Sequence, residues 1–196
     1  MRCFIGFELV DTCLERLRQR IEPFCGVLQN ELGWQVRLVP PGNWHMTCLF
    51  FQDLTDTERA DVWLEVQRNV SSGAWSQLLF PWNGLALWPA PRHPNLICLE
   101  APPFPEAEHW PIAARLDTAP FSKADTTHFA EFRPHITLMR FRGVAVRRYG
   151  KEWEQIGRDI PQVPPSAIRF DRVSLFLSDL KPQRTVYTRE YTARLQ

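Results

Sequence analysis

The chain has 196 residues, of which 44% are hydrophobic and 23% charged, and its formal net charge is +1. These values are typical of a soluble globular protein with one domain or two small lobes, and the near-zero charge argues against electrostatic binding to duplex DNA. No apolar run approaches the roughly 20 residues that span a bilayer, so we expect no membrane segment.

The first half of the chain predicts the order strand, helix, strand, strand, helix. Residues 2–10 form an apolar run that is typical of a buried strand. A helix should follow, because residues 12–15 have the capping-box pattern Thr-x-x-Glu and the next apolar residues recur at helical spacing. Pro23 should kink or split this helix. Two strands are then expected, over 35–39 and over 45–51.

The middle of the chain predicts a second helix, two paired strands and a further helix. The second helix begins with a capping box at residues 55–58. Its inward apolar residues are Val62, Trp63, Val66 and Val70. Residues 76–88 and 95–101 are expected to pair as strands around a proline-rich turn, and residues 105–119 resemble a helix.

The last part of the chain roughly repeats this order. A strand is expected over 135–141, a helix over 145–157, and two closing strands over 168–178 and 185–195. The predicted fold class is therefore α+β and bilobal, with two pseudo-symmetric antiparallel sheets that face a central cleft and with helices on the outside.

One tetrapeptide pattern, His-x-Thr-apolar, occurs in each half of the chain. It starts at His45 and again at His135, and both copies lie in expected strands. Side chains at i and i+2 of a strand share a face, so His45 lies beside Thr47 and His135 beside Thr137. If the halves pack across a cleft, that cleft holds two imidazoles and two hydroxyls. This set suits acid–base chemistry on a phosphate ester, because one histidine can accept a proton while the other donates one.

The alternative interpretation is two structural histidines, each beside a β-favouring threonine, and the symmetric repeat makes it the weaker one. The other three histidines, His93, His109 and His128, are interpreted as surface residues. Neither motif histidine has metal-ligand spacing to another histidine or a carboxylate, and there is no Gly-rich phosphate loop, so we expect no metal and no cofactor. The tryptophans interpreted as core and edge packing are Trp75, Trp82 and Trp88.

On four stretches the chain resembles the two-histidine (2H) phosphoesterase superfamily. Residues 40–47 are similar to its "P-x-N-x-H-x-T" stretch, and residues 132–140 match its second motif, with an arginine five residues after the histidine. Residues 2–7 and 183–187 resemble its first strand and its last turn and strand. Within the superfamily, the resemblance is to the RNA 2′,3′-cyclic phosphodiesterases, also called 2′-5′ RNA ligases, over nearly the whole chain.

The resemblance implies a LigT-like fold in a single bilobal domain, residues 1–196. It implies hydrolysis of a 2′,3′-cyclic phosphate to a 2′-phosphomonoester without a metal, and possible 2′-5′ ligation in reverse. In this family pattern His45 is the acid for the departing 3′-oxygen and His135 is the base for water, an assignment that spacing alone leaves open. Thr47 and Thr137 would donate hydrogen bonds to the phosphate.

Two further residues are candidates for substrate binding. By resemblance Arg140 clamps the phosphate, but its strand parity is opposite to that of His135, so it reaches the cleft only if the strand bends or ends near Met139. The alternative is a surface arginine. Phe4 is expected to stack on a base, as aromatic side chains do with single-stranded nucleotides, and the alternative is a core phenylalanine.

The expected partners are RNA with 2′,3′-cyclic phosphate ends or small cyclic nucleotides, bound by a monomer. The five cysteines form no Cys-x-x-Cys pair, which favours free thiols in the cytoplasm. Two alternatives stay open: a phosphodiesterase for ADP-ribose 1″,2″-cyclic phosphate or 2′-5′ oligoadenylate, and a non-catalytic RNA or nucleotide binder. A binder has no need of a paired acid and base, so the retained motifs favour an enzyme.

Overall fold

The computed structural model describes residues 1–73, 82–91, 94–101, 123–124, 133–142, 148–164, 168–181 and 184–195. Its elements in chain order are β1 (Cys3–Leu9), α1 (Asp11–Asn30), β2 (Val36–Leu38), the 3-10 turn η1 (Pro41–Asn43), β3 (His45–Phe51), α2 (Asp56–Ser71), β4 (Gly84–Trp88), β5 (Leu96–Glu100), β6 (His135–Phe141), α3 (Arg148–Ile156), the 3-10 turn η6 (Gly157–Asp159), β7 (Phe170–Lys181) and β8 (Arg184–Arg194). The helix expected over 105–119 lies outside the described residues, as does most of the region 76–83.

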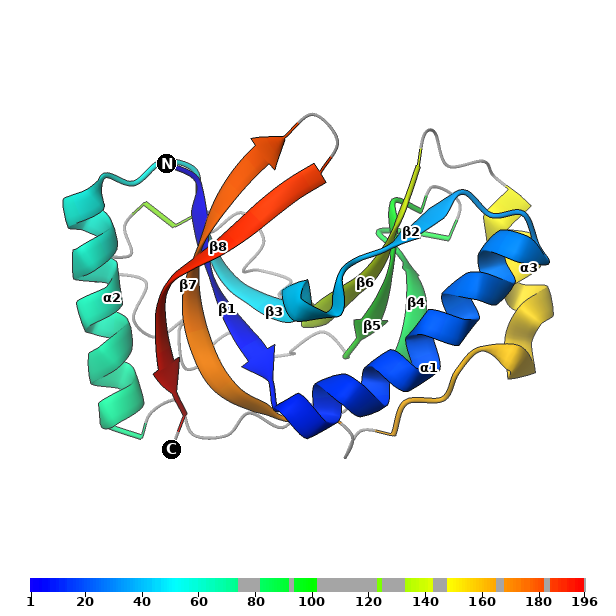
Figure 1. The fold of residues 1–196 in the computed structure, drawn as a ribbon, viewed down its shortest axis with the longest axis horizontal. Coiled ribbons are helices and arrows are strands. Elements are labelled where there is room, and N and C mark those ends of the chain that lie inside the picture. Colours follow the sequence, from blue (N-terminus) through cyan, green and yellow to red (C-terminus); the bar gives the residue numbers. More distant parts are fainter. Residues whose placement is uncertain are drawn as a thin grey trace.

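The predicted bilobal α+β fold is confirmed, with one difference in how the sheets meet. The strands follow the order β4-β5-β6-β3-β1-β7-β8, with β2 also on β6, and every pair is antiparallel. Figure 1 shows one lobe with α2 outside it and a second lobe flanked by α1 and α3. The two expected sheets are joined into one, because Met46 of β3 pairs with Ile136 of β6.

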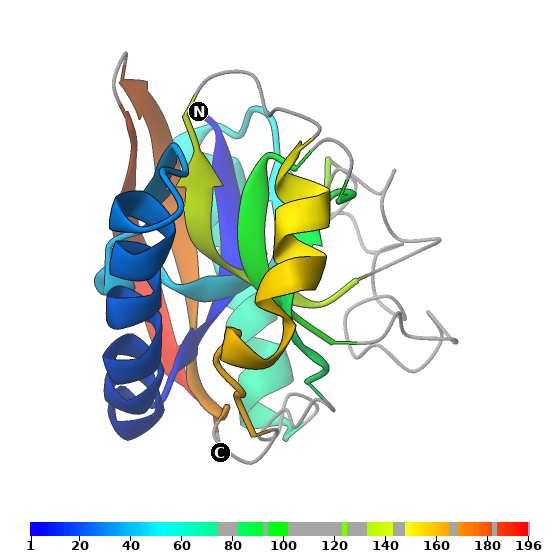
Figure 2. The same ribbon diagram turned by 90° about the vertical axis from the view of Figure 1, so that its right-hand side faces the viewer.

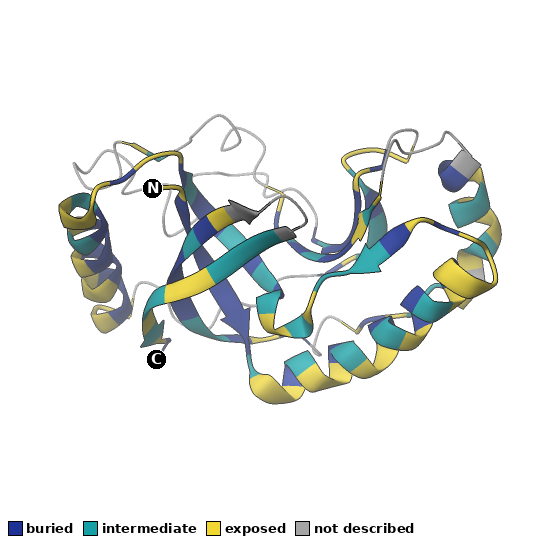
Figure 3. Cartoon of the chain, turned by 45° about the horizontal axis from the view of Figure 1, so that its top comes forward, coloured by how far each residue is buried: buried dark blue, intermediate teal, exposed yellow. Residues whose placement is uncertain are grey.

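Helix α2 covers the outer side of the first lobe. The predicted capping box is present: the Thr55 hydroxyl accepts from the Glu58 amide, and the Glu58 carboxylate accepts from the Thr55 amide at 2.8 Å. The predicted inward face is buried, and Trp63 stacks on Tyr191 of β8 with ring centroids 5.4 Å apart. Figure 3 shows the opposite face of this helix exposed.

Helix α1 differs from its prediction at two points. It begins at Asp11 after Val10 and has no side-chain cap, so the expected capping box at residues 12–15 is wrong. It also runs unbroken through Pro23, whose missing amide removes one helical hydrogen bond. Tertiary packing offsets that loss, since Phe24 is buried and meets Trp153 of α3 with ring centroids 6.1 Å apart. Figure 2 shows α1 and α3 on the same lobe.

Both strands that carry the His-x-Thr pattern contain a β-bulge at the same position. The register of β3 on β1 skips Cys48, and the register of β6 on β5 skips Leu138. An extra residue on one strand lets two successive side chains point to the same side. Cys48 with Leu49, and Leu138 with Met139, are accordingly all buried. After each bulge, the side chains therefore point to the opposite face of the sheet from the one that simple alternation along the strand predicts.

Two sequence-based expectations concern the whole molecule. All five cysteines are free, as the absence of a Cys-x-x-Cys pair predicted, and the structure shows that all five are buried. In the described ranges, no helix combines the length and the apolarity that a membrane crossing requires.

Candidate active site

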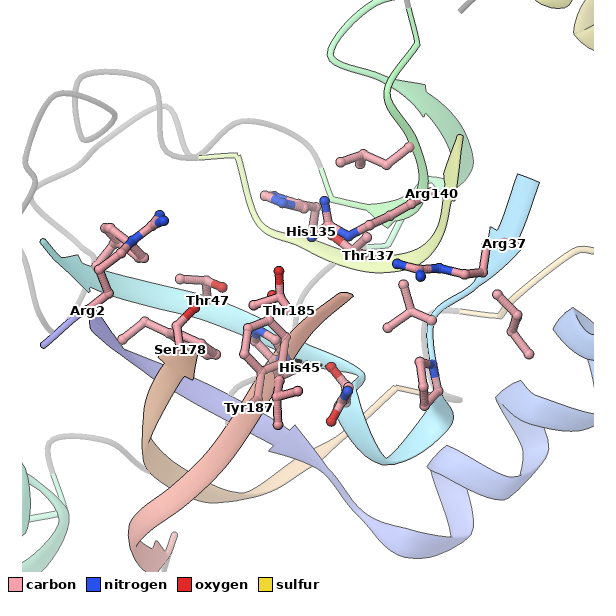
Figure 4. Close-up of a pocket in the computed structure, with 18 residues that line it drawn as sticks. Arg2, Arg37, His45, Thr47, His135, Thr137, Arg140, Ser178, Thr185 and Tyr187 are labelled. Carbon is pink, nitrogen blue, oxygen red and sulfur yellow. Dashed lines mark hydrogen bonds between the residues drawn. The ribbon is translucent and has the colours of Figure 1, made fainter. Parts of the chain in front are cut away.

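The two His-x-Thr motifs line one cleft between the lobes. The cavity measures about 710 Å³, and its lining includes His45 and Thr47 from β3 and His135 and Thr137 from β6. Figure 4 shows the two strands on either side of this cleft. Buried residues alternate with the motif residues along both strands, which fixes the motif side chains on the cleft face.

Each imidazole is held by a backbone carbonyl two residues before it. Nδ1–H of His45 donates to the Asn43 carbonyl at 2.6 Å, and Nδ1–H of His135 donates to the Arg133 carbonyl at 2.9 Å. This bond fixes the tautomer of each neutral ring, so Nε2 is the nitrogen left to accept or donate a proton. The arrangement is the same in both halves.

Burial lowers the pKa of both imidazoles. The pKa of His45 falls from 6.5 to about 4, with Glu8 and the Asn43 carbonyl acting in the opposite direction. The pKa of His135 is also lowered by burial, and the positive charges of Arg140 and Arg133 lower it further. Both rings are therefore neutral near pH 7 in the free protein. A bound anion would favour the protonated form of the ring beside it.

An ionic network of Glu8 and Arg189 lies near His45. Glu8 is opposite His45 in the register of β1 and β3 and is only 5% exposed. Burial raises the pKa of this carboxyl, but hydrogen bonds from Arg189 and Ser174 hold it below its usual range. Arg189 Nη2 donates to Glu8 at 2.6 Å and to the Gly42 carbonyl at 3.0 Å. Arg189 thus connects the negative charge of Glu8 to the turn η1, whose Asn43 carbonyl accepts the hydrogen bond from His45 Nδ1.

Aromatic rings support both histidines. Phe4 stacks on His45 at 4.7 Å between centroids, and Tyr187 of β8 meets the same ring edge-on at 5.4 Å. On the other side of the cleft, Trp88 stacks on His135 at 4.5 Å. The sequence analysis assigned Trp88 to packing but missed its contact with His135, because no local pattern connects the end of β4 with β6.

The expected role of Phe4 in stacking on a base needs correction. Its side chain contributes to the cleft lining, yet it is only 3% exposed. It packs against His45, against Phe176 at 4.8 Å and against Tyr187 at 5.1 Å. These contacts leave almost no ring surface for a base, so the alternative of a core phenylalanine is the better description. Phe4 is thus a buried residue in contact with the ring of His45.

Arg140 lies in the cleft although simple strand parity places it on the other face. The bulge at Leu138 supplies the bend that the sequence analysis required, so Arg140 lines the same cavity as His135 and Thr137. Phe50 holds the equivalent position after the bulge in β3 and also lines the cavity, and the Arg2 guanidinium lies 5.1 Å from its ring centroid.

The side chains that line the cleft carry positive charge. Among the described residues that line it are the arginines Arg2, Arg37 and Arg140, and none is a carboxylate. A guanidinium group can donate two parallel hydrogen bonds to the oxygens of one phosphate, and the threonine hydroxyls add uncharged donors. Within the described residues, no group of three or more His, Cys, Asp or Glu is placed to hold a metal ion. The sequence analysis missed the hydroxyls of Ser178, Thr185 and Tyr187, which line the cleft from β7 and β8.

Comparison with known proteins gives matches among solved structures. No family model matches the chain, and no curated protein matches it. TT0787 of Thermus thermophilus aligns with a TM-score of 0.61 and 22% identity, over 100% of this chain and 98% of that one. A phosphoesterase aligns with a TM-score of 0.60 and 17% identity, over 99% of this chain and 98% of that one. E. coli LigT aligns with a TM-score of 0.58 and 18% identity, over 99% of this chain and 96% of that one. The chain therefore has a LigT-like fold.

Proposed function

We propose that the chain is a metal-independent phosphodiesterase that hydrolyses 2′,3′-cyclic phosphate ends of RNA or nucleotides to 2′-phosphomonoesters. The observation that carries this proposal is the meeting of two His-x-Thr motifs, one from each half, in one cleft lined by arginines. The reverse direction would join RNA ends through a 2′-5′ linkage with the same groups.

The proposed reaction is an in-line attack of water on phosphorus. One imidazole accepts the water proton, the new P–O bond forms, and the P–O3′ bond breaks as the second imidazole protonates the leaving oxygen. Glu8 supports His45 as the acid, since its charge favours the imidazolium against the effects of burial and of Arg140. Arg140 and Arg133 support His135 as the base, since their charges stabilise its neutral form.

The threonines and Arg140 would act on the charge of the phosphate. The hydroxyls of Thr47 and Thr137 would donate to the non-bridging oxygens, where negative charge grows in the transition state. Arg140 lies beyond the bulge on the same face and adds a positive charge. Because these donors are already held by the strands, they need little rearrangement during the reaction.

Ligands of one fold relative are compatible with this substrate class. E. coli LigT has been solved in complex with 3′-AMP, with phosphate, with ATP and with NADP+. These complexes describe LigT, and they support the proposal because the same fold there holds nucleotides and phosphate.

The proposal is tested by turnover of three substrates side by side in EDTA. We expect 2′,3′-cyclic AMP and RNA ending in a cyclic phosphate to be hydrolysed to 2′-phosphates. The rates should be the same with and without EDTA, because the proposed acid and base are side chains. Activity that is lost in EDTA and restored by a divalent ion would show metal-assisted hydrolysis instead. Preference for ADP-ribose 1″,2″-cyclic phosphate would identify the alternative substrate, and binding of all three without turnover would identify a non-catalytic binder.

A methyl group at Gly6 should lower activity through His45. An added Cβ would lie 3.2 Å from His45 Cδ2 and 3.3 Å from ring carbons of Phe4 and Phe176, so the imidazole must shift by a few tenths of an ångström. Because a misplacement of about 1 Å can cost about 10²-fold in rate, we expect Gly6→Ala to lower kcat/KM by roughly 10-fold. The measurement is kcat/KM for 2′,3′-cyclic AMP.

Gly26 in α1 provides the matched control. The nearest atom to an added Cβ there is 4.0 Å away, in the Asn30 side chain. Gly26→Ala should leave kcat/KM unchanged and raise the free energy of unfolding by about 0.5–1 kcal/mol, since alanine is the better helix former. Equal kcat/KM for Gly6→Ala and the unmodified protein would show that the position of His45 is not critical.

A further inference from the structure

Two arginines lie directly opposite each other where β2 meets β6. Arg37 pairs in register with Arg140, and β2 is only three residues long. Like charges opposite each other weaken a sheet. Figure 4 shows both guanidinium groups at one end of the cleft, with Arg2 at the other end.

The arginine pair also lines a second, smaller cavity that adjoins the cleft. This cavity measures about 480 Å³, and its lining consists of Arg37, Arg140, Phe141 and Arg142. Arg37 and Arg140 belong to both cavities. Across the bulge, Thr137 pairs with Cys98 and Arg140 with Leu96, two positions apart on β5, so Arg140 lies roughly 7 Å further along the strand at about 3.3 Å per residue. Because Arg140 lines both cavities, it is placed to contact the phosphate held between the two histidines and also a further group bound beside Arg37.

We propose that Arg37, together with Arg140 and Arg142, forms a second phosphate subsite that binds another phosphate of the same substrate molecule. This inference rests on the proposed function, and it narrows the substrate class. A cyclic mononucleotide has a single phosphate and leaves the subsite without an anion. The end of an oligonucleotide has a further phosphodiester, and ADP-ribose cyclic phosphate has a diphosphate. Guanidinium pairs bind both through bidentate, charge-assisted hydrogen bonds.

The first test compares substrates with and without a second phosphate. The substrates are 2′,3′-cyclic AMP, a dinucleotide that ends in a cyclic phosphate, and ADP-ribose 1″,2″-cyclic phosphate. Arg37→Gln should lower kcat/KM by about 10-fold or more for a substrate that uses the subsite, and by less than about 3-fold for cyclic AMP, since one charged hydrogen bond is lost. The control is Arg16→Gln, on the exposed face of α1, which should affect no substrate.

The pattern of losses decides between the outcomes. A loss confined to the dinucleotide identifies an oligonucleotide end, and a loss confined to the ADP-ribose compound identifies a diphosphate. An equal loss for all three substrates would place Arg37 on the reacting phosphate and overturn the second subsite. No loss for any of them would overturn it as well.

The second test measures binding without turnover, so that failure of the subsite can be told from failure of the proposed function. The probe is a dinucleotide with a 2′-phosphate end, titrated by calorimetry at several salt concentrations. Arg37→Gln should reduce the slope of log Kd against log salt by about 1, the loss of one phosphate contact. An unchanged slope would refute the subsite even if the protein hydrolyses cyclic phosphates. A reduced slope in a protein without hydrolytic activity would support the subsite and reject the proposed function.

Discussion

Replacing either His45 or His135 with alanine is expected to lower turnover of a 2′,3′-cyclic phosphate by about 10²–10⁴-fold, the usual contribution of a general acid or base. The reason is geometric: both rings line one cleft, and a carbonyl bound to Nδ1 leaves Nε2 for proton exchange. The double variant should lose much less than the product of the two single losses, because both groups act on one transition state. The measurement is kcat and kcat/KM for 2′,3′-cyclic AMP.

Loss of packing must be separated from loss of chemistry in these variants. His45 contacts Phe4, Phe176 and Tyr187, so its removal also removes aromatic packing. His45→Gln and His135→Gln keep more side-chain volume but have no group that titrates near neutrality. The glutamine variants should lose as much activity as the alanine variants. Their unfolding temperatures should be closer to that of the unmodified protein. Full activity in any of these variants would show that the histidines are structural.

The dependence of rate on pH is the second large effect. The proposed reaction needs one imidazole protonated and the other neutral, which predicts a bell-shaped profile. Because burial lowers the pKa of His45 to about 4 and also lowers the pKa of His135, kcat/KM should have its maximum below pH 6.5. Above the higher of the two imidazole pKa values, kcat/KM should fall about tenfold for each pH unit, since the protonated fraction of the acid falls at that rate while the base stays neutral.

Bound substrate should shift this profile. The phosphate anion stabilises an imidazolium, so the profile of kcat, which reports on the complex, should lie at higher pH than that of kcat/KM. Imidazole titrations by NMR with and without inorganic phosphate measure the same shift directly. Glu8→Gln removes a charge that raises the pKa of His45, so the limb of the profile that His45 sets should move to lower pH. A flat profile between pH 5 and 8 would contradict the acid–base assignment.

The parts of the site that follow from local sequence were predictable. The alternation of burial around His45 and His135 is a property of each strand alone, and the repeat of the pattern indicated their partnership. The direction of Arg140 was not predictable, because the bulge at Leu138 depends on the register of β6 against β5. Arg37 was missed for a similar reason, since its place in the cleft follows from the pairing of a three-residue strand with β6.

Two capping-box patterns show how tertiary structure decides between similar local signals. The pattern that begins at Thr55 forms as expected. The pattern at residues 12–15 does not, because the chain before it is fixed by other contacts. The Val10 amide donates to the Arg169 carbonyl, and Arg172 donates to Asp11, so the helix begins before Thr12 could serve as its cap. Residues distant in sequence set this boundary.

The central position of β1 has a consequence for how the protein is made. All seven residues of β1 are buried, and the strand pairs with β3 on one edge and with β7 on the other. On the ribosome, β3 emerges soon after β1, whereas β7 starts only at Phe170. Closing so long a loop is entropically costly and slows folding. One edge of the apolar strand β1 therefore stays unpaired until β7 has been synthesised. The lobe that holds His45 should therefore be completed late, when Phe176 reaches the ring of Phe4.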